Sequence, residues 1–292
     1  MLYLSQFEFP DAEEEFDYIL KQKKTCYDTY YPFKILSEHQ LKCLNFEPVT
    51  ILYGGNGSGK TTALNVMAEK LGLQRDALYN RSAFFEGYTG LCYSVSEREI
   101  PKDSRIITSD DVFDFMLNLR SLNEGIDNSR EDLLEEYRRL TDPFVPRFQL
   151  HSLDDYEQLK RVTAARRKTK SQYVRDYLGS NIRERSNGES ALMYFTNKIQ
   201  ENGLYLLDEP ENSLSPERQM ELVKFLEDSV RFFGCQFVIA THSPFFLAMR
   251  DAKIYDLSGE KVCVKRWTEL SNVRAYYDFF KKHESAFESD DE

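Results

Sequence analysis

An eight-residue segment, GGNGSGKT, occupies Gly54–Thr61 and matches the full phosphate-binding pattern GxxxxGKT. Glycines at this spacing let the backbone curl, so that its N–H groups point inward and hold phosphates at the start of a helix. Lys60 would reach the β- and γ-phosphates, and the Thr61 hydroxyl would complete the ligand shell of a magnesium ion. The predicted ATP-binding residues of this P-loop are Gly54, Gly55, Asn56, Gly57, Ser58, Gly59, Lys60, Thr61 and Thr62.

A pair of carboxylates follows an apolar segment in LYLLDEP, at Leu204–Pro210. A strand that ends in Asp208 can hold magnesium from its second shell, so we predict Thr61 and Asp208 as the metal-binding residues. Glu209 is the predicted base that orients and deprotonates the attacking water. The alternative is a buried strand that merely ends in surface carboxylates, and the position of LYLLDEP after a P-loop argues against it. ATP and Mg²⁺ are therefore the expected cofactors, and ATP hydrolysis is the expected reaction.

Two more segments gain meaning from their order along the chain. RSNGES lies directly before a predicted helix, and THSP at Thr241–Pro244 follows an apolar strand. With the P-loop and LYLLDEP, they make the sequence resemble the ABC ATPase superfamily from about Tyr31 to Leu257. The resemblance implies that His242 is a switch histidine that senses the γ-phosphate. It also implies a signature loop that binds ATP held by a second protomer, formed by Ser186, Asn187, Gly188 and Glu189.

The resemblance leaves three positions open or loosely matched. Glu211–Ser215 resembles, more loosely, the D-loop that crosses the dimer interface in this family. The expected Q-loop glutamine is missing, and Glu86 or Ser109–Asp111 are the alternatives for its place. The aromatic residue that stacks on adenine is also open, with the candidates Tyr30, Tyr31 and Phe33.

Alternating strand-like and helix-like segments must position these motifs. The strands are expected at Tyr31–Leu36, Val49–Tyr53, Leu204–Leu207 and Cys235–Thr241, with a hairpin formed by Lys253–Leu257 and Lys261–Trp267. The helices are expected at Lys60–Leu71, Ser190–Gln200 and Pro216–Phe233, the last with Met220, Val223, Leu226 and Val230 on its inner face. Such alternation predicts an α/β fold with a parallel sheet and helices on both faces. The expected fold class is therefore a P-loop NTPase of the ABC ATPase type with an inserted helical lobe.

The helical lobe is predicted at about residues 110–185, within a single ATPase head that spans residues 1–292. Its predicted helices are Asp110–Arg120, Ser129–Leu140 and Asp154–Lys168, with Pro143 and Pro146 at a break.

The bulk composition favours a globular cytoplasmic protein. Hydrophobic residues make up 41% of the chain, charged residues make up 30%, and the five cysteines show no metal-ligand or disulfide spacing. We see no secretory signal and no membrane segment. The net charge of −11 opposes general nucleic-acid binding, although residues 160–185 hold nine basic residues against two acidic ones.

The signature RSNGES, DEPENSLSP and THSP look like the SMC and RecF-like branch, which includes stand-alone bacterial "AAA family ATPase" proteins, rather than transporter subunits with LSGGQ. The predicted function is a nucleotide-controlled switch that forms an ATP-dependent homodimer, in DNA-related or anti-phage defence processes. The alternative is a regulatory ATPase subunit that controls a partner effector protein. A transporter subunit is the third and weakest hypothesis. The possible partners are thus a second copy, a nucleic acid or an effector protein.

Overall fold

The computed structural model describes residues 2–22, 29–142, 156–178 and 187–287 of the chain. It divides into two compact units. The first unit contains Met1–Asp114 and Asn187–Glu292, and the second unit contains Phe115–Ser186. Among the described residues, no helix is long and apolar enough to span a membrane.

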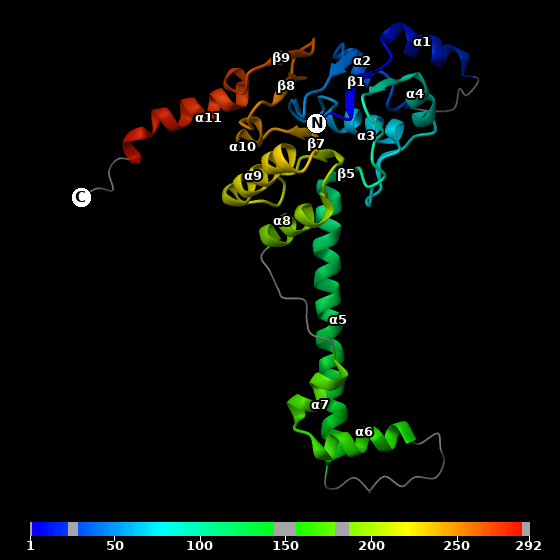
Figure 1. The fold of residues 1–292 in the computed structure, drawn as a ribbon, viewed down its shortest axis with the longest axis vertical. Coiled ribbons are helices and arrows are strands. Elements are labelled where there is room, and N and C mark those ends of the chain that lie inside the picture. Colours follow the sequence, from blue (N-terminus) through cyan, green and yellow to red (C-terminus); the bar gives the residue numbers. More distant parts are fainter. Residues whose placement is uncertain (1, 23–28, 143–155, 179–186, 288–292) are drawn as a thin grey trace. The chain divides into compact units, whose positions relative to one another are not determined.

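In the described residues, a sheet of six strands forms the centre of the first unit (Figure 1). Its strands, in spatial order, are β5 (Arg105–Thr108), β6 (Leu204–Asp208), β7 (Gln236–Thr241), β3 (Val49–Tyr53), β8 (Lys253–Asp256) and β9 (Cys263–Lys265). All neighbours run parallel except β8 and β9, which form an antiparallel pair. Every residue of β3, β6 and β7 is buried, so both faces of these strands are covered. The predicted parallel sheet and the terminal hairpin are confirmed.

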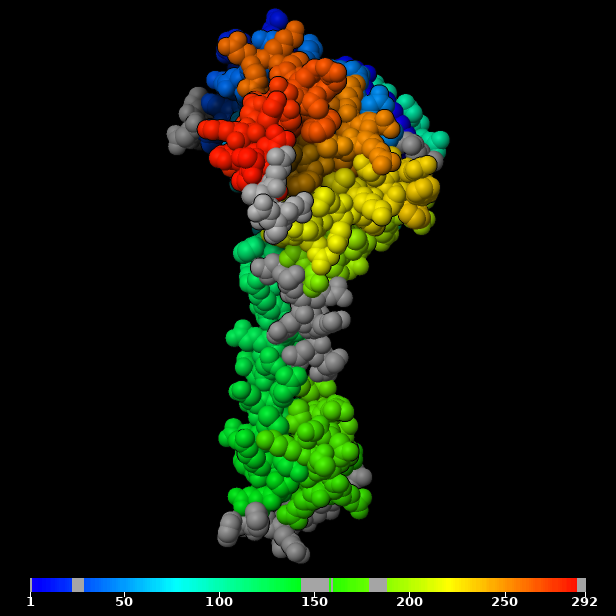
Figure 2. Space-filling view, turned by 90° about the vertical axis from the view of Figure 1, so that its left-hand side faces the viewer, coloured from blue at the N-terminus to red at the C-terminus, as the bar shows by residue number. Residues whose placement is uncertain are grey.

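The helices of the first unit include most of those predicted. They are α1 (Ala12–Lys21), α2 (Ile35–Glu38), α3 (Lys60–Leu71), α4 (Phe85–Leu91), α8 (Asn187–Lys198), α9 (Pro216–Phe232), α10 (Pro244–Leu247) and α11 (Ser271–Lys282). The two 3₁₀-helices η2 (Trp267–Glu269) and η3 (Glu284–Ala286) flank α11. Gly72 ends α3 in a left-handed conformation with φ 64°, as expected for a glycine helix stop. Helices α9 and α11 lie at the surface in the yellow and red parts of Figure 2.

The predicted inner face of α9 is wrong in part. Met220 is 51% exposed, whereas Leu222, Leu226 and Ser229 are buried. Those positions follow the spacing i, i+4, i+7, so they form one helical stripe. Helix α9 packs against α8 and α10, and its buried stripe runs through Leu222 and Leu226 rather than through Met220.

A predicted strand at Tyr31–Leu36 is also wrong. Lys34 has φ 70°, a left-handed conformation that ends any extended run, and α2 begins directly after it. Phe33 and Leu36 are both buried in the core. Their spacing of three residues is typical of a helical turn rather than a strand.

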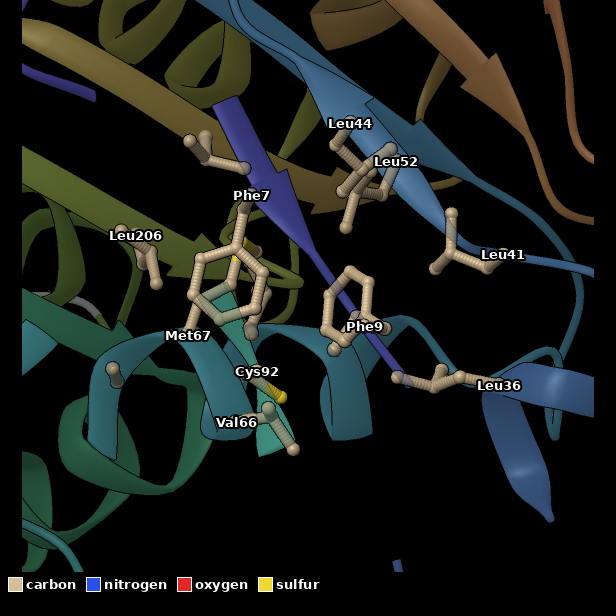
Figure 3. Packing of buried hydrophobic residues seen from close by; sticks show 14 of the residues in the cluster. Phe7, Phe9, Leu36, Leu41, Leu44, Leu52, Val66, Met67, Cys92 and Leu206 are labelled. Atoms are coloured by element: carbon tan, nitrogen blue, oxygen red, sulfur yellow. The ribbon is translucent and has the colours of Figure 1, made fainter. Parts of the chain in front are cut away.

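A second sheet, which the sequence analysis did not predict, packs on the other side of α3. Its strands are β2 (Cys43–Asn45), β1 (Leu4–Glu8) and β4 (Tyr93–Ser96), paired antiparallel in this order. Phe7 and Phe9 lie in one core cluster with Val66 and Met67 of α3 and Leu206 of β6 (Figure 3). Helix α3, which carries the P-loop at its start, is therefore buried between two sheets.

The second unit is helical in its described part. It contains most of α5 (Ser109–Thr141), followed by α6 (Tyr156–Arg167) and α7 (Lys170–Tyr177). The two helices predicted at Asp110–Arg120 and Ser129–Leu140 are a single 33-residue helix. Gly125 is the only glycine or proline within that helix, and one glycine weakens a helix without ending it. The predicted proline break at residues 143–146 lies outside the described residues.

Candidate functional site

The P-loop connects the buried strand β3 to α3. Gly57 and Gly59 have φ of 83° and 85°, which glycine adopts at little cost. A Cβ atom on Gly59 would lie 2.9 Å from Leu36 Cδ2, so a side chain there would force the buried Leu36 side chain to move. The loop therefore curls tightly at the amino end of α3, where backbone N–H groups and the helix dipole favour an anion.

The ammonium group of Lys60 lies against this loop and is only 4% exposed. Its Nζ donates to the carbonyl oxygens of Gly54 at 2.7 Å and Gly55 at 3.1 Å. Its Nζ also lies 4.0 Å from Glu209 Oε1. A buried ammonium needs such partners, because an isolated buried charge is costly. Lys60 and Glu209, predicted from separate motifs, are thus neighbours.

Thr61 and Asp208 meet at the carboxyl end of the sheet. The Thr61 hydroxyl donates to Asp208 Oδ1 at 3.2 Å. Burial raises the pKa of Asp208 to about 6, the charge of Glu209 adds to this effect, and the Thr61 hydrogen bond opposes it. Hydroxyl and carboxylate oxygens are the ligands that Mg²⁺ prefers, so the donor set fits the predicted metal. The metal role of both residues stays a prediction.

Glu209 follows β6 in a left-handed conformation with φ 48°. Non-glycine residues hold such a conformation only when surrounding contacts enforce it. Its backbone N–H donates to Ala240 O of β7 at 2.8 Å, and Asn212 Nδ2 donates to its Oε2 at 3.0 Å. Two strand ends and a neighbouring amide therefore fix the direction of the carboxylate.

Glu211 binds the segment that carries the predicted switch histidine. Its Oε1 accepts hydrogen bonds from Thr241 Oγ1 at 2.7 Å and from the His242 backbone N–H at 2.9 Å. The same oxygen lies 3.2 Å from His242 Nδ1. Glu211 is 6% exposed, and its Oε2 has no hydrogen-bond partner among the described residues. The sequence analysis placed Glu211 only in a loosely matched D-loop. Its position two residues after Glu209 was the signal that could have singled it out.

A cavity of about 310 Å³ opens beside Thr61 and Asp208. Its lining residues are Tyr31, Thr61, Asn65, Leu78, Tyr79, Asn80, Thr108, Ser109, Asp110 and Asp208. Because Thr108 of β5 pairs with Asp208 of β6, the residues that follow β5 lie at the site. Ser109–Asp111 is therefore favoured over the exposed Glu86 of α4 for the Q-loop position.

The candidates for the adenine-stacking aromatic separate in the same way. Tyr31 lines this cavity, and its hydroxyl donates to Thr62 Oγ1 at 3.4 Å. Phe33 is buried and packs edge-on against Tyr88 with ring centroids 4.9 Å apart, so it is a core residue. The ring of Tyr30 contacts that of Phe84 at 4.9 Å. Tyr31 is the candidate that remains beside the P-loop.

The predicted signature loop is described only in part. Ser186 lies outside the described residues, and so does the side chain of Asn187. Gly188 and Glu189 lie in the first turn of α8. Glu189 pairs with Arg218 of α9, with Oε1 and Nη2 3.2 Å apart. Glu189 in the first turn of α8 thus lies beside α9, and the predicted action of the signature loop on a second protomer stays a prediction.

The chain is similar in part to known ATPases. Residues 180–247 match the family described as AAA ATPase domain. No curated protein matches the sequence. The solved Smc head domain with an extended coiled coil from Pyrococcus furiosus has a TM-score of 0.44 and 12% identity, covering 95% of this chain and 100% of that chain.

Two further solved structures are similar at a comparable level. An Smc head bound to the C-winged helix domain of ScpA has a TM-score of 0.42 and 16% identity, covering 80% of this chain and 94% of that one. A dimeric bacterial ABC transporter cassette has a TM-score of 0.38 and 15% identity, with coverage of 77% and 90%. The chain thus carries a P-loop before α3 and a parallel sheet, and its residues 180–247 match the AAA ATPase domain family.

Proposed function

We propose that this protein hydrolyses ATP, and that ATP–Mg²⁺ bridges two copies of it in a nucleotide-controlled switch. The observation that carries the proposal is the hydrogen bond between Thr61 Oγ1 and Asp208 Oδ1. It joins the P-loop to the acidic strand end at one point, next to Glu209. Both motifs were predicted from the sequence, and their chemistry is that of phosphoryl transfer.

The residues of the P-loop hold the nucleotide. The backbone N–H groups of Gly57–Lys60 cradle the phosphates, and Lys60 exchanges its contacts with Gly54 and Gly55 for phosphate oxygens. Thr61 and Asp208 would hold Mg²⁺, and the ion would neutralise the charge that develops on the phosphate oxygens. Tyr31 covers the base.

Glu209 orients the attacking water and accepts its proton. Its contacts with Ala240 and Asn212 hold the carboxylate in one direction, which is the kind of positioning that phosphoryl transfer requires. His242 donates a hydrogen bond to the γ-phosphate. The Glu211 carboxylate accepts a hydrogen bond from His242 Nδ1, which leaves His242 Nε2 to bind the γ-phosphate.

The second copy completes each site with the signature loop at Ser186–Glu189. In this proposal the chain is a single ATPase head with a helical lobe at about residues 110–185. The γ-phosphate joins the two heads, and its removal lets them separate. ATP thus controls association, and hydrolysis resets it.

Mixing two inactive variants tests this arrangement. Lys60→Ala removes the P-loop lysine, and Ser186→Arg blocks the signature loop. In a mixed dimer, the P-loop of one copy meets the intact signature loop of the other, so one site is restored. An equal mixture should recover about a quarter of the wild-type activity, because about half the dimers are mixed. Recovery of no activity from the mixture, when wild type hydrolyses ATP, would refute the bridged dimer.

A specific charge pattern favours a nucleic-acid partner as a second candidate function. Seven basic residues and no acidic one lie from Lys160 to Arg175, along α6, α7 and the turn between them. Arg161 pairs with Glu136 at 3.0 Å and Lys168 pairs with Asp176, whereas Arg166 and Arg167 are exposed. Exposed guanidinium groups can contact phosphates and release counterions.

A gel-shift experiment tests this candidate at several salt concentrations. Arg166→Gln with Arg167→Gln should weaken a salt-dependent shift of duplex DNA. A charge-matched control, Lys224→Gln with Arg231→Gln on α9, should leave the shift unchanged. The absence of any shift at low salt would favour the rival function, in which the ATPase controls an effector protein.

A further inference from the structure

Helix α11 exposes an aromatic face that the proposed ATP cycle does not use. Four aromatic residues of α11 are at least half exposed: Tyr276, Tyr277, Phe279 and Phe280. Phe287, which lies beyond the end of α11, is 68% exposed. Val273 is the buried residue of this helix. Figure 1 shows α11 extending from β8 and β9 away from the rest of the first unit. We call these five aromatic residues the α11 face.

Three rings of the α11 face contact one another in a row. Phe279 lies 5.5 Å from Phe280 between ring centroids, and Phe280 lies 6.1 Å from Phe287. A hollow of about 410 Å³ lies among Tyr277, Phe280, Lys281, Glu284 and Phe287. At 100° per residue, Asp278 and Lys282 fall on the opposite side of the helix, whereas the Arg274 guanidinium lies over the Tyr277 ring, 5.5 Å from its centroid.

We propose that the α11 face pairs with the same face of a second copy of this chain, and that this pairing does not need nucleotide. Five half-exposed aromatic side chains offer about 500 Å² per copy, or about 1,000 Å² for the pair, which reaches the lower bound of a specific interface. A single soluble chain seldom leaves an apolar patch of that size uncovered.

The charges at the rim of the hollow select a second copy as the occupant. The rim carries one base, Lys281, and one acid, Glu284. A two-fold interface is self-complementary, so Lys281 faces Glu284 of the partner subunit, and the reverse pair forms by symmetry. An anionic membrane is a poorer partner, because residues 284–292, which follow α11, hold five acidic residues and no basic one.

The first turn of α11 connects this face to the candidate ATP site. Asn272 Nδ2 donates to the backbone oxygen of His242 at 2.6 Å. The backbone N–H of Asn272 donates to Tyr53 Oη at 3.3 Å, and Tyr53 directly precedes the P-loop. Pairing through α11 would therefore keep two ATPase heads in one assembly after ATP is hydrolysed. The effective concentration of one head near the other is then higher when the next ATP binds. This inference adds a tether to the proposed switch.

Sedimentation of the full chain without nucleotide tests the pairing. Wild type should be a dimer at micromolar concentration, and Phe280→Glu should raise its dissociation constant at least tenfold. Phe232→Glu is the matched control, because Phe232 is a 65% exposed phenylalanine on α9. Circular dichroism would check that both variants are folded. A wild-type monomer, or a Phe280→Glu dimer as tight as wild type, would overturn the pairing.

A charge-reversal experiment tests the identity of the occupant. Lys281→Glu and Glu284→Lys should each weaken self-association, because like charges then meet across the two-fold axis. A mixture of the two variants should associate more tightly than either alone, and equal association in all three samples would contradict a second copy. A second mixing test separates the pairing from the ATP cycle. Lys60→Ala and Ser186→Arg are each combined with Phe280→Glu, and the two double variants are mixed. The mixture should still recover ATPase activity. Loss of the apo dimer with that recovery intact supports both proposals, whereas an apo dimer without ATP hydrolysis supports the tether alone.

Discussion

Replacing Glu211 by glutamine should lower the turnover number for ATP hydrolysis and leave ATP binding nearly unchanged. Glu211 contacts the switch segment through Thr241 and His242, while Lys60 and Thr61 belong to the P-loop. Glutamine keeps the shape of the side chain and one carbonyl acceptor. It loses the negative charge that strengthens the hydrogen bonds from the hydroxyl, the backbone N–H and the imidazole.

The size of the effect follows from the hydrogen bonds that change. A hydrogen bond to a charged group contributes about 1.5–3 kcal/mol, and a neutral one contributes about 0.5–1.5 kcal/mol. All donors to Glu211 bind one oxygen, and glutamine keeps a neutral acceptor there. The difference between a charged and a neutral hydrogen bond is about 1–1.5 kcal/mol, and we assign this loss to the orientation of His242. This corresponds to a fall of about five- to tenfold in the turnover number.

A double-mutant cycle with His242→Ala measures whether Glu211 acts through the histidine. Steady-state kinetics would give the turnover number and KM, and titration with a fluorescent ATP analogue would give the binding constant. In the His242→Ala background, Glu211→Gln should have almost no further effect on turnover. An equal fall in both backgrounds, or a loss of ATP affinity that matches the loss of turnover, would refute this role for Glu211.

Three other predictions follow from the site. Lys60→Ala should abolish binding of a fluorescent ATP analogue, and preserved affinity would contradict the P-loop assignment. Burial raises the pKa of Asp208 from 3.8 to about 6, so its contribution to stability is complete below about pH 4 and is lost as the pH rises through 6. Thermal melts without nucleotide should therefore show Asp208→Asn more stable than wild type at pH 7, by up to about 3 kcal/mol, with little difference at pH 4. Asp111 accepts from the backbone N–H groups of Ala77 at 2.5 Å and Thr108 at 2.6 Å. Asp111→Ala should lower the free energy of unfolding by about 2–3 kcal/mol in urea titrations, whereas no loss would show that water replaces the carboxylate.

Local patterns in the sequence were sufficient to predict the elements that carry the P-loop and the acidic strand end. The buried run Val49–Tyr53, the glycines after it and the apolar spacing of Lys60–Leu71 predicted β3, the loop and α3. Leu204–Leu207 and Cys235–Thr241 predicted β6 and β7 within one residue. Each signal depends on neighbours a few residues away, because periodicity and turn residues report the local backbone. The chemical roles of the site residues stay predictions.

Long-range pairing decided the rest. The strand β1 pairs with segments that lie far along the chain, such as Phe7 with Ser94, and no local pattern encodes those partners. The buried stripe of α9 depended on its neighbours along the fold, among them α8 and α10, and α2 replaced a predicted strand because Phe33 and Leu36 are both buried in the core.

The sequence by itself determined the chemistry available to this protein: a phosphate-binding loop, two adjacent carboxylates and a histidine after a buried strand. Only the tertiary structure decided which side chains act on one another. The order β5-β6-β7-β3 brings Ser109, Asp208 and His242 to one edge, and it sets Glu211 against the histidine. The physical reason is that side chains at the ends of parallel strands meet according to the order of the strands in the sheet, which residues distant in sequence establish together.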